Sequence, residues 1–574
     1  MPLLVVTPVG AFFMQKNKGG EMKFSGAEII IKLLELKGIK TVAGIPGGAN
    51  LPIYDALYRS RIKHVLTRHE QGAGFIAQGM ARSTGKAAVC FATSGPGATN
   101  LITAIADAML DSVPIIAITG QVPSSQLGTD AFQEVDTYGL TIPVSKHNYL
   151  VRSAGELLDI IPEAFRIAES GRPGPVVIDI PKDIQEQEIE ISEWPEFKMH
   201  NSSFAIDRVK IDQISKAINQ AERPLLYIGG GAVNSCAHKL ILKLSEKCSI
   251  PVTSTLMGLG CMPADNPLFL GMLGMHGARF TNLILDETDL LLAFGVRFDD
   301  RATGNITRFC RQARIVHIDI DDAEINKIKK TDLWINGDLS AVLREIIPDI
   351  NSNKRKTWIS FINKLKNKYP LNGTDRNSLS CPIGLIQYLG KIARPDTIIT
   401  TDVGQHQMWV AQHYPFSKPR TLLTSGGLGT MGFGLPAAIG AALANRSKKI
   451  VCISGDGSFL MNIQELATLA DHNLNVTVII MNNGHLGLVR QQQELFYGKK
   501  YIASKFKTKT DFITVARGFG LKGFDLGNEE NPLEILKNVL NDRGSCIVNA
   551  PIHYSKNVTP MVPPGAANHE MIGE

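Results

Sequence analysis

Short runs of β-branched and other apolar residues alternate with helical patterns along almost the whole sequence. A strand that is apolar along its whole length is covered on both faces, and such strands between helices are typical of parallel sheets. At 574 residues the chain has room for about three or four domains. We therefore predict an α/β chain of doubly wound, parallel-sheet domains. The clearest runs are at 87–92, 115–119, 176–180, 225–228, 290–294, 315–320, 398–401, 450–453 and 476–481.

Two polar segments interrupt this alternation. The first contains Pro195, and the second is rich in Lys and Asn with one helical stretch. We interpret them as linkers between three units of similar size. We also expect a disordered N-terminal tail, with Met1, Met14 and Met22 as alternative starts, and a C-terminal tail. The predicted order is tail 1–22, domain 23–190, linker 191–209, domain 210–350, linker 351–380, domain 381–552 and tail 553–574.

The composition excludes several classes of protein. Hydrophobic residues make up 44% of the chain and charged residues 20%, which is ordinary for a globular protein with a core. The formal net charge is only +6 with scattered Lys and Arg, so no nucleic-acid or membrane surface is predicted. The apolar stretch 1–13 lacks a basic segment and is too short to span a bilayer. Eight Cys without a C-x-x-C pair favour buried, reduced thiols and a cytoplasmic protein.

Two of the apolar runs end on an oxygen-bearing side chain. One stops at a Gly-Asp-Gly that contains Asp456, and the other at twin Asn residues that include Asn483, 27 positions later. The carboxyl ends of neighbouring parallel strands lie side by side, where open α/β sheets bind ligands. Glycines let the backbone approach an anion, and a helix beginning near Phe459 would point its amino end there. The alternative is a tight turn with Asp456 as helix N-cap.

Carboxylate and amide oxygens suit Mg²⁺ that is shared with phosphates, and this spacing matches the thiamin diphosphate and magnesium motif. Thiamin chemistry also needs a carboxylate that protonates the aminopyrimidine ring. Glu70 is the candidate, because it follows a strand at 63–66 and begins a helix. The alternative is a carboxylate that only stabilises the helix N-terminus. A Gly-rich loop at 93–100, which includes Gly95, ends another strand near the same ring.

With these motifs on one chain, the sequence from about Lys23 onward resembles the catalytic large subunits of acetohydroxyacid synthase, also called acetolactate synthase. The resemblance implies pyrimidine-binding, FAD-binding and diphosphate-binding domains in that order, with the C-terminal tail over the active site. It implies a homodimer or tetramer with the active site between two subunits, and a separate small regulatory subunit. The implied reaction joins two pyruvates to 2-acetolactate, or pyruvate and 2-ketobutyrate to 2-aceto-2-hydroxybutyrate, in branched-chain amino-acid synthesis.

The resemblance also assigns ligands for thiamin diphosphate and Mg²⁺. Met431 matches the bulky residue beneath the cofactor that enforces its bent shape, although a Met in an apolar segment is usually core filler. The implied Mg²⁺ ligands are the side chains of Asp456 and Asn483 and the main-chain carbonyl of His485. The implied thiamin diphosphate contacts are Pro46, Gly95, Val403, Gly404, Gln405, His406, Gly429, Met431, Gly457, Ser458, Leu486 and Gly487.

The middle of the chain carries the implied FAD site. A strand followed by the Gly-rich turn 229–231 is by itself weak evidence for a dinucleotide, and some thiamin enzymes keep this domain without flavin. In the family FAD performs no net redox step. The implied contacts are Arg172, Gly229, Gly230, Gly231, Thr255, Leu256, Met257, Leu273, Gly274, Met275, His276, Gly295, Arg297, Asp299, Arg301, Asp319, Ile320 and Asp338.

A few further residues are implied for the substrate. Gln121, Lys182 and Arg301 match residues that line the substrate channel, where a cation would attract a keto-acid carboxylate; each of them, taken singly, also fits a surface salt bridge. Gly48 would place main chain against the reacting centre. The implied second-substrate pocket contains Met275, Arg301, Val489 and Gln492. Gln492 stands where many family members have a Trp, which predicts a weak preference for 2-ketobutyrate over pyruvate.

Three other functions stay open from the residues alone. A pyruvate oxidase or 2-keto acid decarboxylase of the same superfamily would share Glu70, Asp456 and Asn483. A nicotinamide dehydrogenase would explain the turn 229–231 but leave the metal motif unused. A non-catalytic subunit would be expected to lose Glu70 or Asp456, and both are present.

Overall fold

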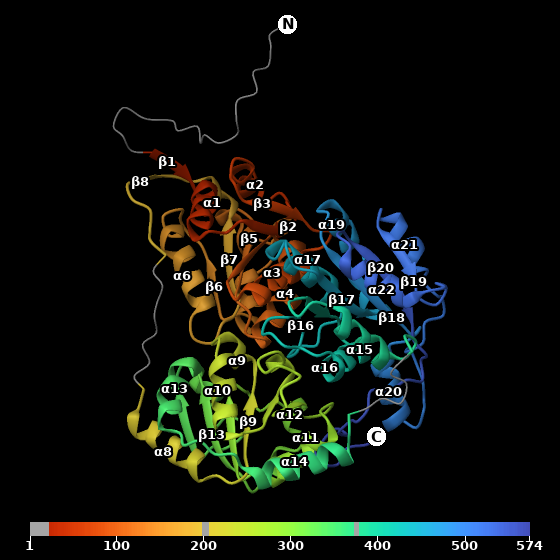
Figure 1. Cartoon of the computed structure of the whole chain (residues 1–574). Coiled ribbons are helices and arrows are strands. Elements are labelled where there is room, and N and C mark those ends of the chain that lie inside the picture. The colour runs from red at the N-terminus through yellow and green to blue at the C-terminus, as the bar shows by residue number, and fades with distance from the viewer. Residues whose placement is uncertain (1–21, 198–205, 372–377, 574) are drawn as a thin grey trace.

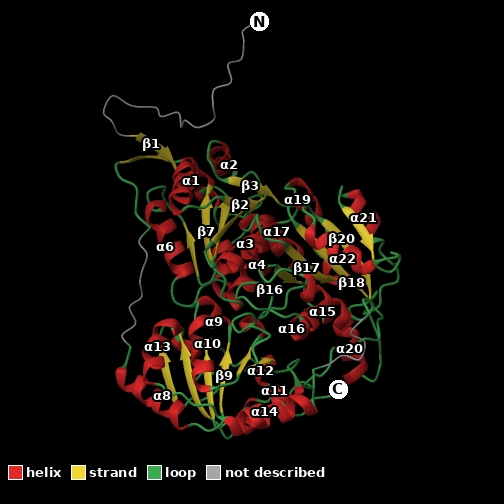
Figure 2. Cartoon of the chain, viewed as in Figure 1, coloured by secondary structure: helices red, strands yellow, loops and turns green. Residues whose placement is uncertain are grey.

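The computed structural model describes residues 22–197, 206–371 and 378–573, and these residues form three six-stranded sheets and one two-stranded sheet (Figure 1). Every strand pair within the three large sheets is parallel. Helices flank each sheet (Figure 2). The predicted fold class of three α/β units with parallel sheets is therefore confirmed. The proposed tail 1–22 lies outside the described residues except for Met22, which begins β1.

The N-terminal sheet has the strand order β3-β2-β4-β5-β7-β6. All seven residues of β5 are buried, as expected for a strand covered on both faces. Helix α1 begins with a capping box between Ser25 and Glu28 and ends at Gly38, where φ is +84°. The elements are β1 (Met22–Ser25), α1 (Gly26–Lys37), β2 (Thr41–Gly44), α2 (Leu51–Tyr58), β3 (Lys63–Leu66), α3 (Glu70–Thr84), β4 (Ala88–Ala92), α4 (Pro96–Leu110), β5 (Ile115–Gln121), α5 (Thr137–Thr141), β6 (His147–Leu150), α6 (Leu157–Glu169), β7 (Val176–Pro181), α7 (Lys182–Glu186) and β8 (Glu188–Ile191), which pairs with β1.

The central sheet has a different order, β11-β10-β9-β12-β13-β14. Numbered by appearance in the chain, this is 3-2-1-4-5-6, the strand order of dinucleotide-binding sheets. The order reverses between β9 and β12, and a crevice is expected at the carboxyl ends of two such strands. The elements are α8 (Arg208–Gln220), β9 (Pro224–Ile228), α9 (Gly230–Asn234), α10 (His238–Cys248), β10 (Val252–Ser254), β11 (Phe269–Met272), α11 (Arg279–Glu287), β12 (Leu290–Phe294), α12 (Asp300–Thr303), β13 (Arg314–Asp319), β14 (Leu333–Asn336), α13 (Leu339–Ile346) and α14 (Lys356–Lys368).

The C-terminal sheet, β16-β15-β17-β18-β20-β19, has the same order of appearance as the N-terminal sheet, 2-1-3-4-6-5 in each case. The two sheets therefore present equivalent carboxyl edges. The elements are α15 (Pro382–Ile392), β15 (Ile398–Thr401), α16 (Gln405–His413), β16 (Leu422–Leu423), α17 (Gly434–Ala444), β17 (Ile450–Gly455), α18 (Asp456–Phe459), α19 (Glu465–Asp471), β18 (Val476–Asn482), α20 (Gly487–Phe496), α21 (Phe512–Gly518), β19 (Lys522–Asp525), α22 (Pro532–Asn541) and β20 (Cys546–Pro551).

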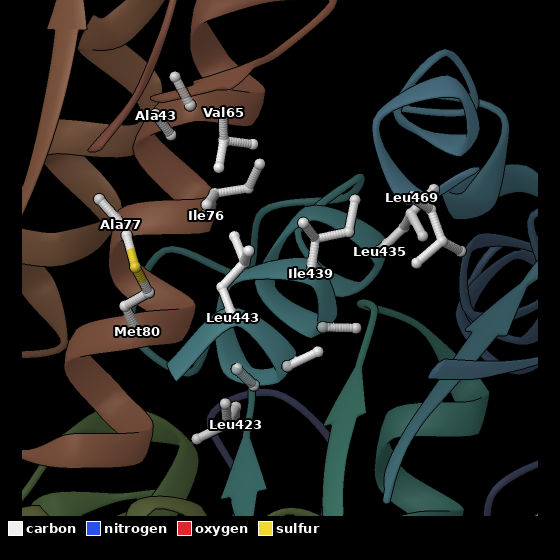
Figure 3. Close-up of a cluster of buried hydrophobic side chains, with 14 of the residues drawn as sticks. Ala43, Val65, Ile76, Ala77, Met80, Leu423, Leu435, Ile439, Leu443 and Leu469 are labelled. Carbon is white, nitrogen blue, oxygen red and sulfur yellow. The ribbon is translucent and has the colours of Figure 1, made fainter. Parts of the chain in front are cut away.

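The N- and C-terminal domains share one hydrophobic core, centred on α3 and α17 (Figure 3). Ile76 and Met80 of α3 belong to the same buried cluster as Leu443 of α17. The two helices approach so closely that a Cβ on Gly440 would collide with the carbonyl oxygen of Ile76. This close packing fixes α3 rigidly against the C-terminal domain of the same chain.

One predicted linker contains an element of the central domain. Residues 356–368, which the sequence places within the linker 351–380, form α14. Trp358 and Ile362 are buried in the same cluster as Tyr227 of β9, and the Trp358 indole donates a hydrogen bond to the Pro224 carbonyl at 3.1 Å. Because the exposed face of this helix is rich in Lys and Asn, its apolar stripe is difficult to recognise in the sequence. Parts of both predicted linkers, 198–205 and 372–377, lie outside the described residues.

Two general properties bear on the predicted class. None of the described helices has the length and apolar character that a membrane crossing requires. The eight cysteines are free thiols, and all except Cys236 are buried. Burial raises the pKa of Cys90 and of Cys261 to about 12, so these thiols remain protonated and unreactive at neutral pH.

Candidate active site

A cavity opens at the carboxyl edge of the C-terminal sheet. The space within its outline that no atom fills is about 490 Å³, and this volume includes open solvent. Residues that follow β15, β17, β18 and β20 converge on it, as expected at a point where strand order reverses. Its lining consists of Val403, Gly404, Gln405, His406, Trp409, Met431, Gly455, Asp456, Gly457, Ser458, Met481, Asn483, His485, Leu486, Gly487, Leu488, Val489 and Ile552.

The Gly-Asp-Gly and the twin Asn meet at this edge. Asp456 is only 4% exposed, and its Oδ2 accepts a hydrogen bond from the main-chain amide of Gly484 at 2.8 Å. Burial raises the pKa of Asp456 to about 6. Asn483 accepts from the His485 amide at 2.9 Å, which turns the chain back toward the cavity. The structure thus brings Asp456 and Asn483 together around an oxygen-rich hollow.

The helices α16 and α20 present uncapped N-termini to the same hollow. Helix α16 begins at Gln405 after Gly404, and α20 begins at Gly487 after Leu486; neither has a side-chain cap. Unpaired amides at a helix N-terminus bind anions. The sequence predicts a helix beginning near Phe459 in this role; α18 instead spans Asp456–Phe459 and so begins three residues earlier. Its uncapped amino end also lines the cavity, and α16 and α20 add two further amino ends.

Gln405 and Gln491 tie the cavity to the C-terminal segment. Gln405 Nε2 donates to Gln491 Oε1 at 2.9 Å and to the Lys556 carbonyl at 3.0 Å. Gln491 exchanges two hydrogen bonds with the main chain of Val558, at 2.9 and 2.8 Å. Further along, the Val562 amide donates to the Met275 carbonyl at 2.8 Å. The segment 553–573 therefore runs from the cavity to the central domain.

His406 offers the clearest sign of a missing partner in the cavity. Its Nε2 atom is buried without a hydrogen bond, and burial lowers the pKa of His406 to about 3. The ring is therefore neutral at physiological pH. Buried polar atoms are normally satisfied, so the orphaned nitrogen fits a bound polar group in this hollow. Together with the two amino ends and the carboxylate, the residues present fit a metal-bound diphosphate.

Glu70 lies at the carboxyl edge of the N-terminal sheet, as the sequence places it. It is the first residue of α3, is 9% exposed and accepts a hydrogen bond from Asn100 Nδ2 at 2.9 Å. Gly95 precedes α4 with φ +58°, in a region that favours glycine. Pro46 and Gly48 follow β2. Among the described residues, none of these lines the cavity of the C-terminal sheet.

At the same edge, Gln121 is the last residue of β5 and Lys182 directly follows β7. Gln121 Nε2 donates to Asp179 Oδ2 at 3.0 Å and to the Val135 carbonyl at 2.8 Å. Asp179 is 1% exposed, and burial raises its pKa to about 7. Sequence reasoning missed Asp179, although a carboxylate inside an otherwise apolar strand was an available signal. It also missed Trp409 and Gln491, which no local motif marks.

The predicted FAD residues gather at the carboxyl edge of the central sheet. A Cβ on Gly231 would lie 2.6 Å from the Cα of Gly295, so the ends of β9 and β12 meet at the switch point. The guanidinium of Arg172 reaches the sheet from the N-terminal domain and pairs with Glu324 at 2.8 Å. Burial lowers the pKa of His276 to about 4, and its Nδ1 has no partner. The residues at or just after strand ends are Gly229, Gly230, Gly231, Thr255, Leu256, Met257, Leu273, Gly274, Met275, His276, Gly295, Arg297, Asp299, Asp319, Ile320 and Asp338.

The proposed second-substrate residues are divided between α20 and the central domain. Val489 lines the cavity and is 44% exposed. Gln492, one turn further along α20, is exposed and outside the lining. Arg301 is exposed in α12, and its Nη1 contacts Met275 Sδ at 3.7 Å. Val489, Gln492 and Arg301 therefore form an exposed set of side chains in the single chain.

Comparison with known families agrees with the site and fold. Residues 24–140, 211–346 and 402–550 match, in turn, the N-terminal TPP-binding domain, the central domain and the C-terminal TPP-binding domain of thiamine pyrophosphate enzymes. Each match falls on one of the three parallel sheets, although β6, β7 and β15 lie outside the matched ranges. Fold and site therefore define a thiamin diphosphate-dependent enzyme.

Full-length relatives narrow this class. The chain is 54% identical to the acetolactate synthase isozyme 1 large subunit of Escherichia coli (strain K12), over 96% of this chain and 98% of the relative. It is 44% identical to the isozyme 2 large subunit of the same organism, over 96% and 99% of the two chains. It is 46% identical to an acetolactate synthase of Arthrospira platensis, over 98% and 100%. The chain belongs to the acetolactate synthase large-subunit family.

Proposed function

We propose that this chain is a carboligase that decarboxylates pyruvate and joins the remaining two-carbon unit to a second 2-keto acid. With pyruvate as acceptor the product is 2-acetolactate, and with 2-ketobutyrate it is 2-aceto-2-hydroxybutyrate. These are the first shared steps of valine, leucine and isoleucine synthesis. The observation that carries the proposal is the cavity at the C-terminal sheet, where Asp456, Asn483 and two uncapped helices meet, in a chain of this family.

The proposal assigns the cavity to thiamin diphosphate and Mg²⁺. Asp456, Asn483 and the His485 carbonyl would hold the metal, and the amides at the starts of α16 and α20 would bind the diphosphate. The described residues contain no group of three or more His, Cys, Asp or Glu side chains that could hold a metal ion by itself, so an ion here would share its remaining sites with the diphosphate. When bound, thiamin diphosphate supplies a nucleophilic carbon and an electron sink for decarboxylation.

Glu70 is proposed to hold and move the proton on the aminopyrimidine ring. A carboxylate at the start of α3 has the right chemistry for this role. Because Glu70 lies outside the cavity of its own chain, we propose a homodimer or tetramer in which it serves the cavity of another chain. Pro46, Gly48 and Gly95 would then bring main chain close to the ring. Gln121, Lys182 and Arg301 are proposed to bind the substrate, with Arg301 facing its carboxylate.

FAD is proposed for the crevice of the central sheet. The strand order 3-2-1-4-5-6 and the close approach at Gly231 and Gly295 support a dinucleotide there. FAD would bind without net redox chemistry. A small regulatory subunit and a cytoplasmic location complete the proposal, since relatives are named large subunits and the eight cysteines are free.

The test is direct incubation of the purified protein with pyruvate, thiamin diphosphate, Mg²⁺ and FAD. We expect 2-acetolactate, detected as acetoin after acid decarboxylation. Free acetaldehyde without acetolactate would indicate a 2-keto acid decarboxylase, and net oxidation of pyruvate would indicate an oxidase; either outcome overturns the proposal. Omitting Mg²⁺ from protein stripped of metal should abolish the product.

A further inference from the structure

Two carboxylates surround a buried guanidinium outside the cofactor cavity. Arg82, in the last turn of α3, donates from Nη2 to Asp107 Oδ1 at 3.0 Å and to Asp111 Oδ2 at 2.9 Å. The three side chains are 6%, 0% and 0% exposed. A buried ion pair is favourable only when its remaining polar atoms are also satisfied. The partners of the remaining carboxylate oxygens therefore indicate what the cluster does.

Those oxygens bind a loop of the C-terminal domain, residues 424–430. Asp107 Oδ2 accepts from the Ser425 hydroxyl and, at 2.8 Å, from Thr430 Oγ1. Asp111 accepts from two successive main-chain amides of the loop, at 2.9 and 2.7 Å. Three of the seven loop residues are glycines, so the free loop would be conformationally permissive. The two carboxylates hold it in one conformation.

Arg82 also contacts the chain on both sides of Met431. Its Nη1 donates to the Thr424 carbonyl at 3.0 Å, where the loop begins. Its guanidinium carbon lies 5.0 Å from the centroid of the Phe433 ring, which is fully buried. Met431 lies between Thr430 and Phe433 and lines the cavity. The cluster thus contacts Thr430, directly before Met431, and Phe433, two residues after it.

We propose that the Arg82–Asp107–Asp111 cluster is a positioning device, by which the N-terminal domain presets the 424–431 loop for thiamin diphosphate in the same chain. The inference rests on the proposed function of the cavity. A preset loop binds its ligand more tightly because no ordering cost remains at binding. An ion pair that only joined the domains would stabilise the fold and leave cofactor affinity unchanged.

Thr430→Val tests this with little change in shape, and Thr430→Ser restores the hydroxyl. Hydrogen–deuterium exchange of 424–432 is measured in protein free of cofactor, and the dissociation constant of thiamin diphosphate is measured calorimetrically with Mg²⁺ present. Loss of a hydrogen bond to a charged group predicts exchange about tenfold faster and binding about tenfold weaker for Thr430→Val, with near-wild-type values for Thr430→Ser. Asp107→Asn should shift both in the same direction.

Thr288→Val is the matched control. Its hydroxyl is also fully buried and donates to the Ile284 carbonyl at 2.9 Å, far along the chain in the central domain. It should lower the melting temperature without changing loop exchange or cofactor affinity. Unchanged loop exchange in both Thr430→Val and Asp107→Asn would overturn the inference, as would faster exchange with unchanged affinity. Failure of the wild type to bind thiamin diphosphate would instead refute the proposed function, and loop exchange in the cofactor-free protein would still test the hold of the cluster.

Discussion

The carboxyl edges of the N-terminal and C-terminal sheets have the same strand order, yet they carry their functional residues differently. At the C-terminal edge, Asp456 and Asn483 converge on one cavity within a single chain. At the N-terminal edge, Glu70 and Gln121 bond to neighbours in their own domain, at 2.9 and 3.0 Å. One edge forms a cavity within the single chain, and Glu70 and Gln121 of the other edge lie outside that cavity.

The difference follows from what each edge is proposed to bind. A metal-bound diphosphate needs several oxygen atoms and amides within a few ångströms, and one switch point of one sheet can supply them. The aminopyrimidine ring belongs to the cofactor whose diphosphate binds at the C-terminal edge, and it is also proposed to contact Glu70 at an N-terminal edge. These two edges must therefore face each other. Since α3 is packed tightly on α17 of its own chain, Glu70 cannot swing to its own cavity. A second copy of the chain is the proposed source of the facing edge.

The largest expected effect comes from the N-terminal edge. Glu70→Gln should lower turnover and the rate of thiazolium C–H exchange by about 10²–10⁴-fold, the usual worth of general acid–base assistance. Steady-state assays and proton exchange followed by NMR measure this. Glu28→Gln, the same change in the first turn of α1, is the control and should affect stability only. Near-wild-type exchange in Glu70→Gln would remove Glu70 from the mechanism.

The C-terminal edge is tested by Asp456→Asn. This change should weaken Mg²⁺ and thiamin diphosphate binding together by at least about 100-fold, the upper end of the effect of losing an outer-shell partner. Asp179→Asn replaces another buried carboxylate, one that lies in the N-terminal sheet, and should leave metal affinity unchanged. Calorimetric titrations on both variants decide the matter. Equal cofactor affinity in wild type and Asp456→Asn would restore the simple turn interpretation.

Substitution of Gln492 tests whether the exposed side of α20 forms part of the second-substrate pocket. Gln492 lies three residues after Val489 on α20, hence on the same helix face. An indole that grips one extra methylene is worth about 10–200-fold in discrimination, so Gln492→Trp should raise preference for 2-ketobutyrate by about tenfold or more. A competition assay with both keto acids measures the product ratio, and Gln492→Ala separates loss of the amide from gain of the indole. Strong wild-type preference, unchanged in Gln492→Trp, would contradict the assignment.

A smaller effect is expected from pH. Burial raises the pKa of Asp456 from 3.8 to about 6, and only the ionised carboxylate binds Mg²⁺. Protons therefore compete with the metal as pH falls through about 6, and affinity should drop by up to about tenfold per pH unit below that. In the metal-free protein the sign is opposite: stability falls as pH rises from 3.8 to about 6. Mg²⁺ titrations at several pH values across this range should show the drop in affinity in the wild type and should not show it in Asp456→Asn.

The buried strands and the ends of their loops were readable from the sequence. The runs 290–294 and 398–401 match β12 and β15 to the residue, and Glu70 does begin α3, because strongly apolar strands and adjacent motifs are local signals. The predicted runs do not include the edge strands β6, β11, β14, β16 and β19, since short or half-exposed strands lack a continuous apolar run. They also omit the interior strands β2, β10 and β20.

The site residues, too, could be predicted only where a local signal in the sequence marks them. Asp456 and Asn483 were found because each directly follows a strand. Gln491 and the Arg82–Asp107–Asp111 cluster were not, because only tertiary packing brings them to the cavity or its loop. The sequence of one chain does not show whether Glu70 faces the cavity of its own chain or that of another chain. The shared site therefore stays a proposal.

Complementation between two inactive variants tests the central claim most directly. Glu70→Gln and Asp456→Asn are unfolded, mixed in equal amounts and refolded, so that random pairing makes about half of the dimers mixed. If Glu70 of one chain serves the cavity of the other, each mixed dimer has one site with both residues intact. The mixture should then recover about a quarter of wild-type activity, while each variant alone stays inactive. No recovery, with mixed dimers demonstrated by mass spectrometry, would contradict a site shared between two chains.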